Sequence, residues 1–298
     1  MERGHGGEVN NGGPIFMEIK KVIVYGAGTM GNGIVQVCAA SGFDVTMVDI
    51  KQEFVDHGLN TIKKSLAKLV GKEKIAQAQA DEILGRIKIS VESVCDADIV
   101  IEAIIENEDA KKNLFSDLDR RCPKHTILAS NTSSIPITKI ASATKRPGQV
   151  IGMHFMNPVP VMKGVEIIRG KETSDETYQI VDKMVKDLGK VPGVSNDFPG
   201  FVANRILMPY INEGAWALHE GVSDAANIDL IAKTCLNMPM GPLELGDLIG
   251  LDVCLAIMNV MYEGFGDEKF SPCPKIRQLV DQGSLGRKTG KGFYDYGK

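Results

Sequence analysis

Short apolar runs alternate with longer amphipathic segments from about residue 19 to residue 154. Most runs are almost continuously apolar and are bounded by polar residues or glycine, as expected for parallel strands buried on both faces. The pattern predicts strands at 22–25, 45–49, 87–90, 99–103, 127–130 and 150–154, and helices at 30–40, 54–70, 80–84 and 110–121. This rhythm predicts an α/β fold with a Rossmann-type, mostly parallel sheet.

The pattern changes after residue 154. Two further strands are expected at 164–169 and 190–195, with a helix at 175–188 between them. From residue 200 onward only helices are expected, at 200–221, 224–236 and 251–262. We therefore expect a sheet domain over 17–199 and an all-α C-terminal domain over 200–298. Residues 1–16 are rich in Gly and Asn and are expected to form a disordered tail.

A glycine motif follows the first expected strand. Gly26, Gly28 and Gly31 form G-x-G-x-x-G with Thr29 and Met30 inside it, and a helix is expected to follow. The first glycine permits a tight turn, the second lets the backbone approach a pyrophosphate, and the third lets the helix pack on the strand. The free N–H groups at the start of the helix favour an anion. The alternative is that these glycines only form a tight turn.

Asp49 ends the next expected strand, 21 residues after Gly28. A carboxylate here can accept hydrogen bonds from the adenosine ribose and would repel a 2′-phosphate, so NAD is favoured over NADP. Lys51 is close enough to weaken that preference. The alternative role for Asp49 is to cap the end of the strand.

His154 ends an apolar strand, and chemistry in open parallel sheets collects at the carboxyl ends of strands. Glu166 lies twelve residues later in a returning strand, so the two side chains could meet. A carboxylate on one imidazole nitrogen fixes the tautomer, and the other nitrogen can then exchange a hydroxyl proton. Separately, each residue could instead be structural, His154 in the core and Glu166 on the surface.

A reacting oxygen also needs neutral hydrogen-bond donors. Asn204, early in the long helix, and Ser133, just past a strand end, are candidates. Taken singly, each could instead cap a helix or a loop.

Composition excludes several classes of protein. The formal net charge of −4 and the pI of about 5.8 argue against nucleic-acid binding. The six cysteines form no C-x-x-C pair, so no metal site is expected and a reducing cytoplasm fits. No apolar stretch is long enough for a membrane span.

Seven segments together identify a family resemblance. They are GAGTMG at 26–31, ASNTSS at 129–134, GMHFMNP at 152–158, VEIIRG at 165–170, DFPGFVANR at 197–205, MGPLELGD at 240–247 and GRKTGKGFYDY at 286–296. From about Met17 to its end, the chain resembles the 3-hydroxyacyl-CoA dehydrogenase family, and within it the bacterial 3-hydroxybutyryl-CoA dehydrogenases.

The resemblance implies NAD-dependent interconversion of (S)-3-hydroxybutyryl-CoA and acetoacetyl-CoA in butanoate or fatty acid metabolism, by a cytoplasmic homodimer built through the helical domain. It implies that His154 is the catalytic base held by Glu166, and that Asn204 and Ser133 contact the substrate. The NAD site is implied to include Asp49, Glu106, Lys111, Ser133, Asn157 and Lys288. Ser65 and Lys72, within a local group of lysines, are implied to contact coenzyme A.

Two other functions remain open at this point. One is a dehydrogenase of a small free hydroxy acid, whose related enzymes use a lysine as the acid or base. The other is a catalytically silent NAD-binding module.

Overall fold

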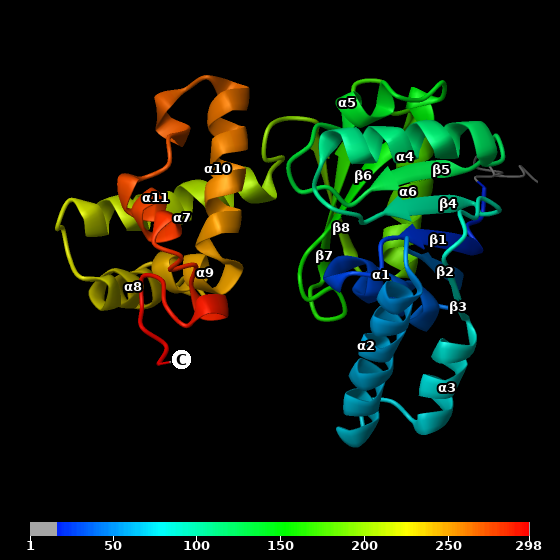
Figure 1. Ribbon diagram of the computed structural model, residues 1–298, viewed down its shortest axis with the longest axis horizontal. Helices are drawn as coiled ribbons and strands as arrows, with labels where there is room; N and C mark the ends of the chain where they lie inside the picture. Colours follow the sequence, from blue (N-terminus) through cyan, green and yellow to red (C-terminus); the bar gives the residue numbers. More distant parts are fainter. Residues whose placement is uncertain (1–16, 298) are drawn as a thin grey trace, which may run out of the picture.

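The computed structural model describes residues 17–297, so the tail expected over 1–16 lies outside the described residues. A domain built on one large sheet is followed by a domain of helices (Figure 1). This order confirms the predicted fold class.

Within residues 17–297 the sheet has eight strands in the order β3-β2-β1-β4-β5-β6-β7-β8. Every neighbouring pair is parallel except β6 and β7, which are antiparallel. The strands are β1 (Lys21–Tyr25), β2 (Asp44–Val48), β3 (Ile87–Ser90), β4 (Ile99–Glu102), β5 (Ile127–Ser130), β6 (Val150–Phe155), β7 (Gly164–Arg169) and β8 (Val191–Asn196).

Helices cover both faces of the sheet (Figure 1). One face packs against α1 (Thr29–Ala40), α2 (Gln52–Gly71), α3 (Gln77–Gly85) and α6 (Asp175–Asp187). The other face packs against α4 (Glu108–Arg121) and α5 (Ile137–Ala141). Burial of the inner strands β1, β4, β5 and β6 on both faces explains why their sequences are almost continuously apolar.

The helical domain has its own core around Ile211, Leu243 and Met258. It comprises α7 (Ala203–His219), α8 (Ala225–Thr234), α9 (Pro242–Ile249), α10 (Leu251–Phe265) and α11 (Pro274–Asp281). Sequence analysis missed α5, α9 and α11, none of which exceeds eight residues. Such short helices show too few turns for a clear apolar period.

The expectation that the long helix begins at residue 200 was wrong, because α7 begins at Ala203. Gly200 and Phe201 have φ values of +75° and +51°. These left-handed conformations cannot belong to a right-handed helix. They instead form a turn between β8 and α7.

Among the described residues, no single helix is both long and apolar enough to cross a membrane. By length and composition alone, α9 and α10 would suffice together, but they are bent by 100° where they meet.

Candidate functional site

An imidazole and a carboxylate face each other across β6 and β7. The antiparallel register pairs His154 directly with Glu166. Side chains of directly paired residues lie on the same face of a sheet. His154 Nδ1 lies 3.2 Å from Glu166 Oε2, and both side chains are buried. The structure therefore brings together the two residues that the sequence singled out.

The second oxygen of Glu166 is held by the start of the helical domain. Glu166 Oε1 accepts hydrogen bonds from the backbone N–H of Val202 at 2.6 Å and of Ala203 at 3.3 Å. Burial alone would raise the pKa of Glu166, but these bonds and the one from His154 outweigh it and lower the pKa. An ionised carboxylate only accepts, so His154 Nδ1 must donate, which leaves Nε2 as the basic nitrogen.

Phe201 makes this arrangement possible through a strained backbone. Its left-handed φ of +51° is unusual for a large side chain and costs about 1–3 kcal/mol. The buried ring packs edge-on against His154, with ring centroids 6.0 Å apart. The next residue, Val202, donates its N–H to Glu166. No sequence signal predicted this role.

Ser133 and Asn204 also meet. Asn204 is buried in the first turn of α7, and its Nδ2 donates to the backbone carbonyl of Ser133 at 2.8 Å. The turn that carries Ser133 is tied to β6 as well, because Asn131 Oδ1 accepts from the N–H of Phe155. The two predicted polar residues are thus joined to each other and, through this turn, to the strand that carries His154.

The glycine motif borders a large groove. A cavity of about 780 Å³ is lined by Gly26, Gly28 and Asp49 together with apolar side chains that include Ile50 and Phe54. Gly26 has a φ of +105°, and a Cβ atom there would overlap the carbonyl of Ala103. A side chain at Gly31 would likewise overlap Gly26. Both glycines are therefore required by close backbone contact.

The polar groups of this groove fit a dinucleotide. Asp49 lies just after β2 and accepts a hydrogen bond from the N–H of Ala27 at 2.7 Å. Gly28 is the N-cap of α1 and has no side-chain cap, so the helix that begins with Thr29 and Met30 presents N–H groups to an anion. A carboxylate beside a helix start is the arrangement that binds a ribose next to a pyrophosphate.

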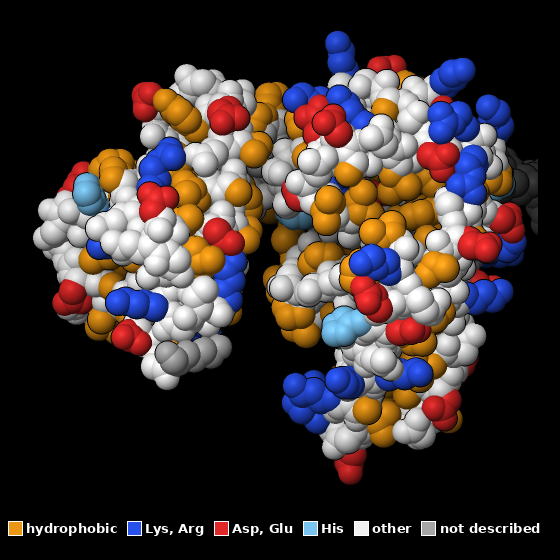
Figure 2. Space-filling view, in the orientation of Figure 1, with side chains coloured by type: hydrophobic (Ala, Val, Ile, Leu, Met, Phe, Trp, Pro, Cys, Tyr) orange, Lys and Arg blue, Asp and Glu red, His pale blue; other side chains and the backbone are white. Residues whose placement is uncertain are grey.

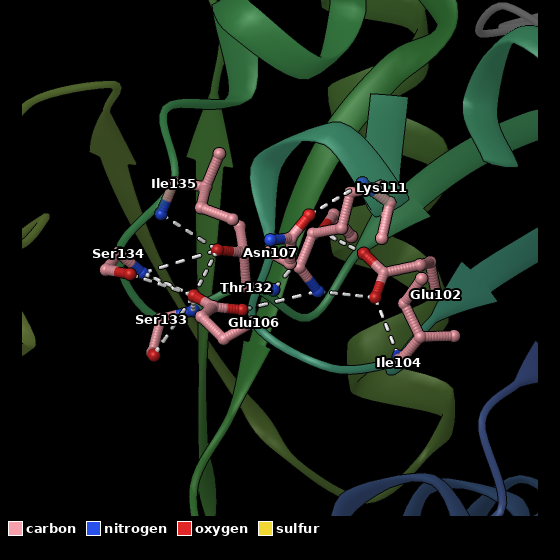
Figure 3. A network of polar contacts seen from close by, with 11 residues as sticks. Glu102, Ile104, Glu106, Asn107, Lys111, Thr132, Ser133, Ser134 and Ile135 are labelled. Carbon is pink, nitrogen blue, oxygen red and sulfur yellow. Dashed lines mark hydrogen bonds and ion pairs between the residues drawn. The ribbon is translucent and has the colours of Figure 1, made fainter. Parts of the chain in front are cut away.

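A charge network, buried at Lys111 and Glu102 and partly exposed at Glu106, lies beside the groove (Figure 3). Lys111 Nζ lies 2.5 Å from Glu102 Oε1 and 3.3 Å from Glu106 Oε2. Glu102 also accepts from Ser130 Oγ at 2.6 Å and from the N–H of Ile104 at 2.7 Å. Sequence reasoning missed Glu102, although a carboxylate closing an apolar strand at the edge that carries the other site residues was a usable signal.

Glu106 holds the turn that carries Ser133. Its Oε1 accepts hydrogen bonds from Thr132 Oγ1 at 2.6 Å, from the N–H of Ser133 at 2.9 Å and from the N–H of Ser134 at 3.0 Å. Burial alone would raise the pKa of Glu106, but Lys111 and these bonds outweigh it and lower the pKa. In Glu102, burial dominates and raises the pKa.

The remaining predicted residues lie apart from this cluster. Asn157 is exposed, at a cis peptide bond with Pro158. Lys288 lies in the helical domain, where its Nζ contacts Asp252 at 2.5 and 2.7 Å. Ser65 lies on α2, and Lys72 directly follows the last residue of that helix.

A cleft separates the two domains, and Lys and Arg side chains gather over the lower part of α2 (Figure 2). The exposed lysines of this segment are Lys63, Lys64, Lys68, Lys72 and Lys74. In the part of the chain that the structure describes, no group of three or more His, Cys, Asp or Glu side chains could hold a metal ion.

Two family models together match most of the chain. Residues 21–198 match the model of the 3-hydroxyacyl-CoA dehydrogenase NAD binding domain, and residues 200–296 match that of the 3-hydroxyacyl-CoA dehydrogenase C-terminal domain. The chain is 54% identical to a probable 3-hydroxybutyryl-CoA dehydrogenase of Bacillus subtilis, over 94% of this chain and 98% of that protein. It is 48% identical to the 3-hydroxybutyryl-CoA dehydrogenase of Bradyrhizobium diazoefficiens, over 93% of this chain and 96% of that one.

A similar solved structure is that of (S)-3-hydroxybutyryl-CoA dehydrogenase from Ralstonia eutropha. It has 48% sequence identity and a TM-score of 0.91, and the match covers 94% of this chain and 100% of that chain. These similarities identify NAD as the cofactor, which fits the carboxylate and the free helix start in the groove.

Glu166→Gln is expected to lower the free energy of unfolding at pH 7 by about 1–3 kcal/mol, because it weakens charge-assisted hydrogen bonds in a buried site. The pKa of Glu166 is lowered on folding from an ordinary value of 4.5. Its stabilisation is therefore full above that pH and is lost as the pH falls through the folded pKa. Urea unfolding across pH should show the difference from the unsubstituted protein shrinking below pH 4.5.

The exposed Glu172→Gln is the control and should change little at any pH. A Glu166→Gln difference that persists unchanged in acid would contradict the assignment.

Proposed function

The chain belongs to the 3-hydroxyacyl-CoA dehydrogenase family, and from that membership we propose that it interconverts (S)-3-hydroxybutyryl-CoA and acetoacetyl-CoA with NAD(H). The names of the similar proteins support the four-carbon substrate. The single observation that supports the mechanism is the buried contact between His154 Nδ1 and Glu166 Oε2.

His154 is the proposed general acid and base. With Nδ1 donating to the Glu166 carboxylate, Nε2 is free to take the proton of the substrate 3-hydroxyl group. The negative charge of Glu166 then stabilises the imidazolium that forms. In the reverse direction the same Nε2 returns the proton to the oxygen. Bound NAD would accept or supply the hydride at C4 of its nicotinamide.

Asn204 and Ser133 are proposed to position the substrate oxygens. The Asn204 amide is fixed by its bond to the Ser133 carbonyl, so it needs little reorganisation when substrate binds. Gly26, Gly28, Thr29, Met30, Gly31 and Asp49 are proposed to hold the adenosine and pyrophosphate, and Glu106, Lys111, Ser133, Asn157 and Lys288 the rest of the cofactor.

Coenzyme A is proposed to bind along α2. Ser65 and Lys72 are the proposed contacts, within the exposed lysines described above. Coenzyme A carries several phosphate charges, and clustered lysines attract anions in an otherwise acidic protein. This basic surface favours a thioester over a small free acid.

A steady-state panel tests the substrate. Acetoacetyl-CoA should be reduced with a far higher kcat/KM than free acetoacetate, and NADH should serve better than NADPH because of Asp49. Among ketoacyl-CoAs from four to sixteen carbons, the shortest should be preferred. Equal use of free acetoacetate would indicate a hydroxy acid dehydrogenase. NADH binding without turnover of any acyl-CoA would indicate a silent module.

His154→Ala should lower kcat by about 10²–10⁴-fold, because general acid–base catalysis contributes that much. NADH affinity, followed by its fluorescence, should not change, since no cofactor contact is assigned to the imidazole. His125→Ala, at a half-exposed surface position, is the matched control and should turn over normally. The assignment fails if His154→Ala retains most of its activity.

We also propose a homodimer formed through the helical domain. This domain exposes large apolar side chains on α8, α9 and α10 and in the adjoining segments, and contiguous apolar surface marks interfaces. They are Val222, Leu230, Ile231, Leu236, Met238, Leu248 and Val253.

Sedimentation analysis should give twice the mass of the chain. Substitution of both Leu230 and Leu236 by Glu should shift the sample toward monomer, because charges buried in an interface are costly. Val191→Glu, on the exposed edge strand β8, should leave the mass unchanged. A monomeric unsubstituted protein, or a double variant that stays dimeric, would contradict this interface.

The domain division between residues 199 and 200 is likewise a proposal, supported by the end of β8 at Asn196 and the start of α7 at Ala203. The cytoplasmic location and the role in butanoate metabolism stay predictions.

A further inference from the structure

We propose that Glu102 is a positioning residue for both sides of the active site: it acts through Lys111 on the Ser133–Asn204 contact, and directly through the N–H of Ile104 on the cofactor groove. The inference rests on the proposed function, because it assigns roles to those two features. Glu102 itself is buried at the end of β4, so it acts on the reaction through its neighbours.

Glu102 is needed to neutralise the buried ammonium group of Lys111. Lys111 has only 1% of its side chain exposed, and Glu102 has none. Burying an unpaired ammonium is very costly, so a partner must accompany it. Glu102 supplies the closer contact, at 2.5 Å, while Glu106 lies at 3.3 Å and directs its other oxygen at the Ser133 turn. Figure 3 shows Lys111 between the two carboxylates.

Glu102 first affects the Ser133 turn, which is proposed to position the substrate. With Glu102 satisfying most of the Lys111 charge, Glu106 keeps its Oε1 on the N–H groups of Ser133 and Ser134. The Ser133 carbonyl in turn accepts from Asn204. Without the charge of Glu102, Lys111 would draw Glu106 toward itself, and the turn that positions Ser133 and Asn204 would shift.

Glu102 also affects the groove that is proposed to bind the cofactor. Glu102 Oε1 also accepts from the N–H of Ile104. The segment between them contains Ala103, whose carbonyl packs so closely on Gly26 that no side chain would fit there. Glu102 therefore fixes the segment after β4 against which Gly26 packs. Ile104, in this segment, lines the same groove as Gly28.

The test uses Glu102→Gln, Lys111→Met and the double variant in the full chain. We expect Glu102→Gln to lower kcat for acetoacetyl-CoA reduction by up to about 100-fold, since small displacements of catalytic groups cost that much. The KM for NADH and its Kd by fluorescence titration should rise. Because the effect of Glu102 on the Ser133 turn passes through Lys111, kcat of the double variant should be no lower than that of Lys111→Met alone.

The control for a merely structural role is another buried ion pair on α4. Asp119 pairs with Arg146 at 2.7 Å, and both are largely buried near the opposite end of the helix. Asp119→Asn should lower the melting temperature but leave kcat and NADH affinity unchanged. Ser130→Ala keeps the charge of Glu102 but removes one hydrogen bond to it and the acceptor of the Thr132 N–H, so it should shift the same kinetic parameters less. Ser130→Ala replaces Glu102→Gln in this test if Glu102→Gln does not fold.

Losses of kcat in Glu102→Gln and Lys111→Met that multiply in the double variant would overturn the proposal. So would a Glu102→Gln or Ser130→Ala variant with normal kcat and NADH affinity. If the unsubstituted protein does not reduce acetoacetyl-CoA, the proposed function fails, while NADH titration of the same variants still tests the effect of Glu102 on the groove.

Discussion

The antiparallel return of β7 beside β6 is the constraint on which the site depends. In this otherwise parallel sheet, that single reversal sets His154 directly opposite Glu166. A shift of one residue in the register would turn one of the two side chains to the other face of the sheet and separate them. The contact between His154 and Glu166 is therefore held by strand pairing itself, which is far more rigid than a contact between loops.

Charge burial dominates the chemistry around this pair. Glu166, Glu102 and Lys111 are buried, Glu106 is partly exposed, and each is satisfied by an ionic partner or by several hydrogen bonds. Such groups contribute little net stability compared with apolar residues. Removing one partner, however, leaves the other as an unpaired buried charge, which is strongly destabilising. These groups therefore act mainly to hold the side chains of the site in place, and contribute little to the stability of the fold.

The carboxyl edge of the parallel strands gathers the residues of the candidate site. Gly26 follows β1, Glu102 ends β4, the Ser133 turn follows β5, and His154 lies near the end of β6. The helical domain completes this edge, because the strained turn at Phe201 brings α7 against Glu166 and Asn204 against Ser133. The junction between the two domains thus completes the candidate site.

Local sequence determined much of this protein. Apolar runs located all eight strands within the described residues, and the spacing of Gly26, Gly28, Gly31 and Asp49 indicated a dinucleotide groove before any coordinates, because these features depend on short-range sterics and periodicity. Only the tertiary structure decided the register that pairs His154 with Glu166, the left-handed conformation of Phe201, and the neutralisation of Lys111 by Glu102. These depend on contacts between residues far apart in the chain, whose energies outweigh local preference and leave no periodic trace in the sequence.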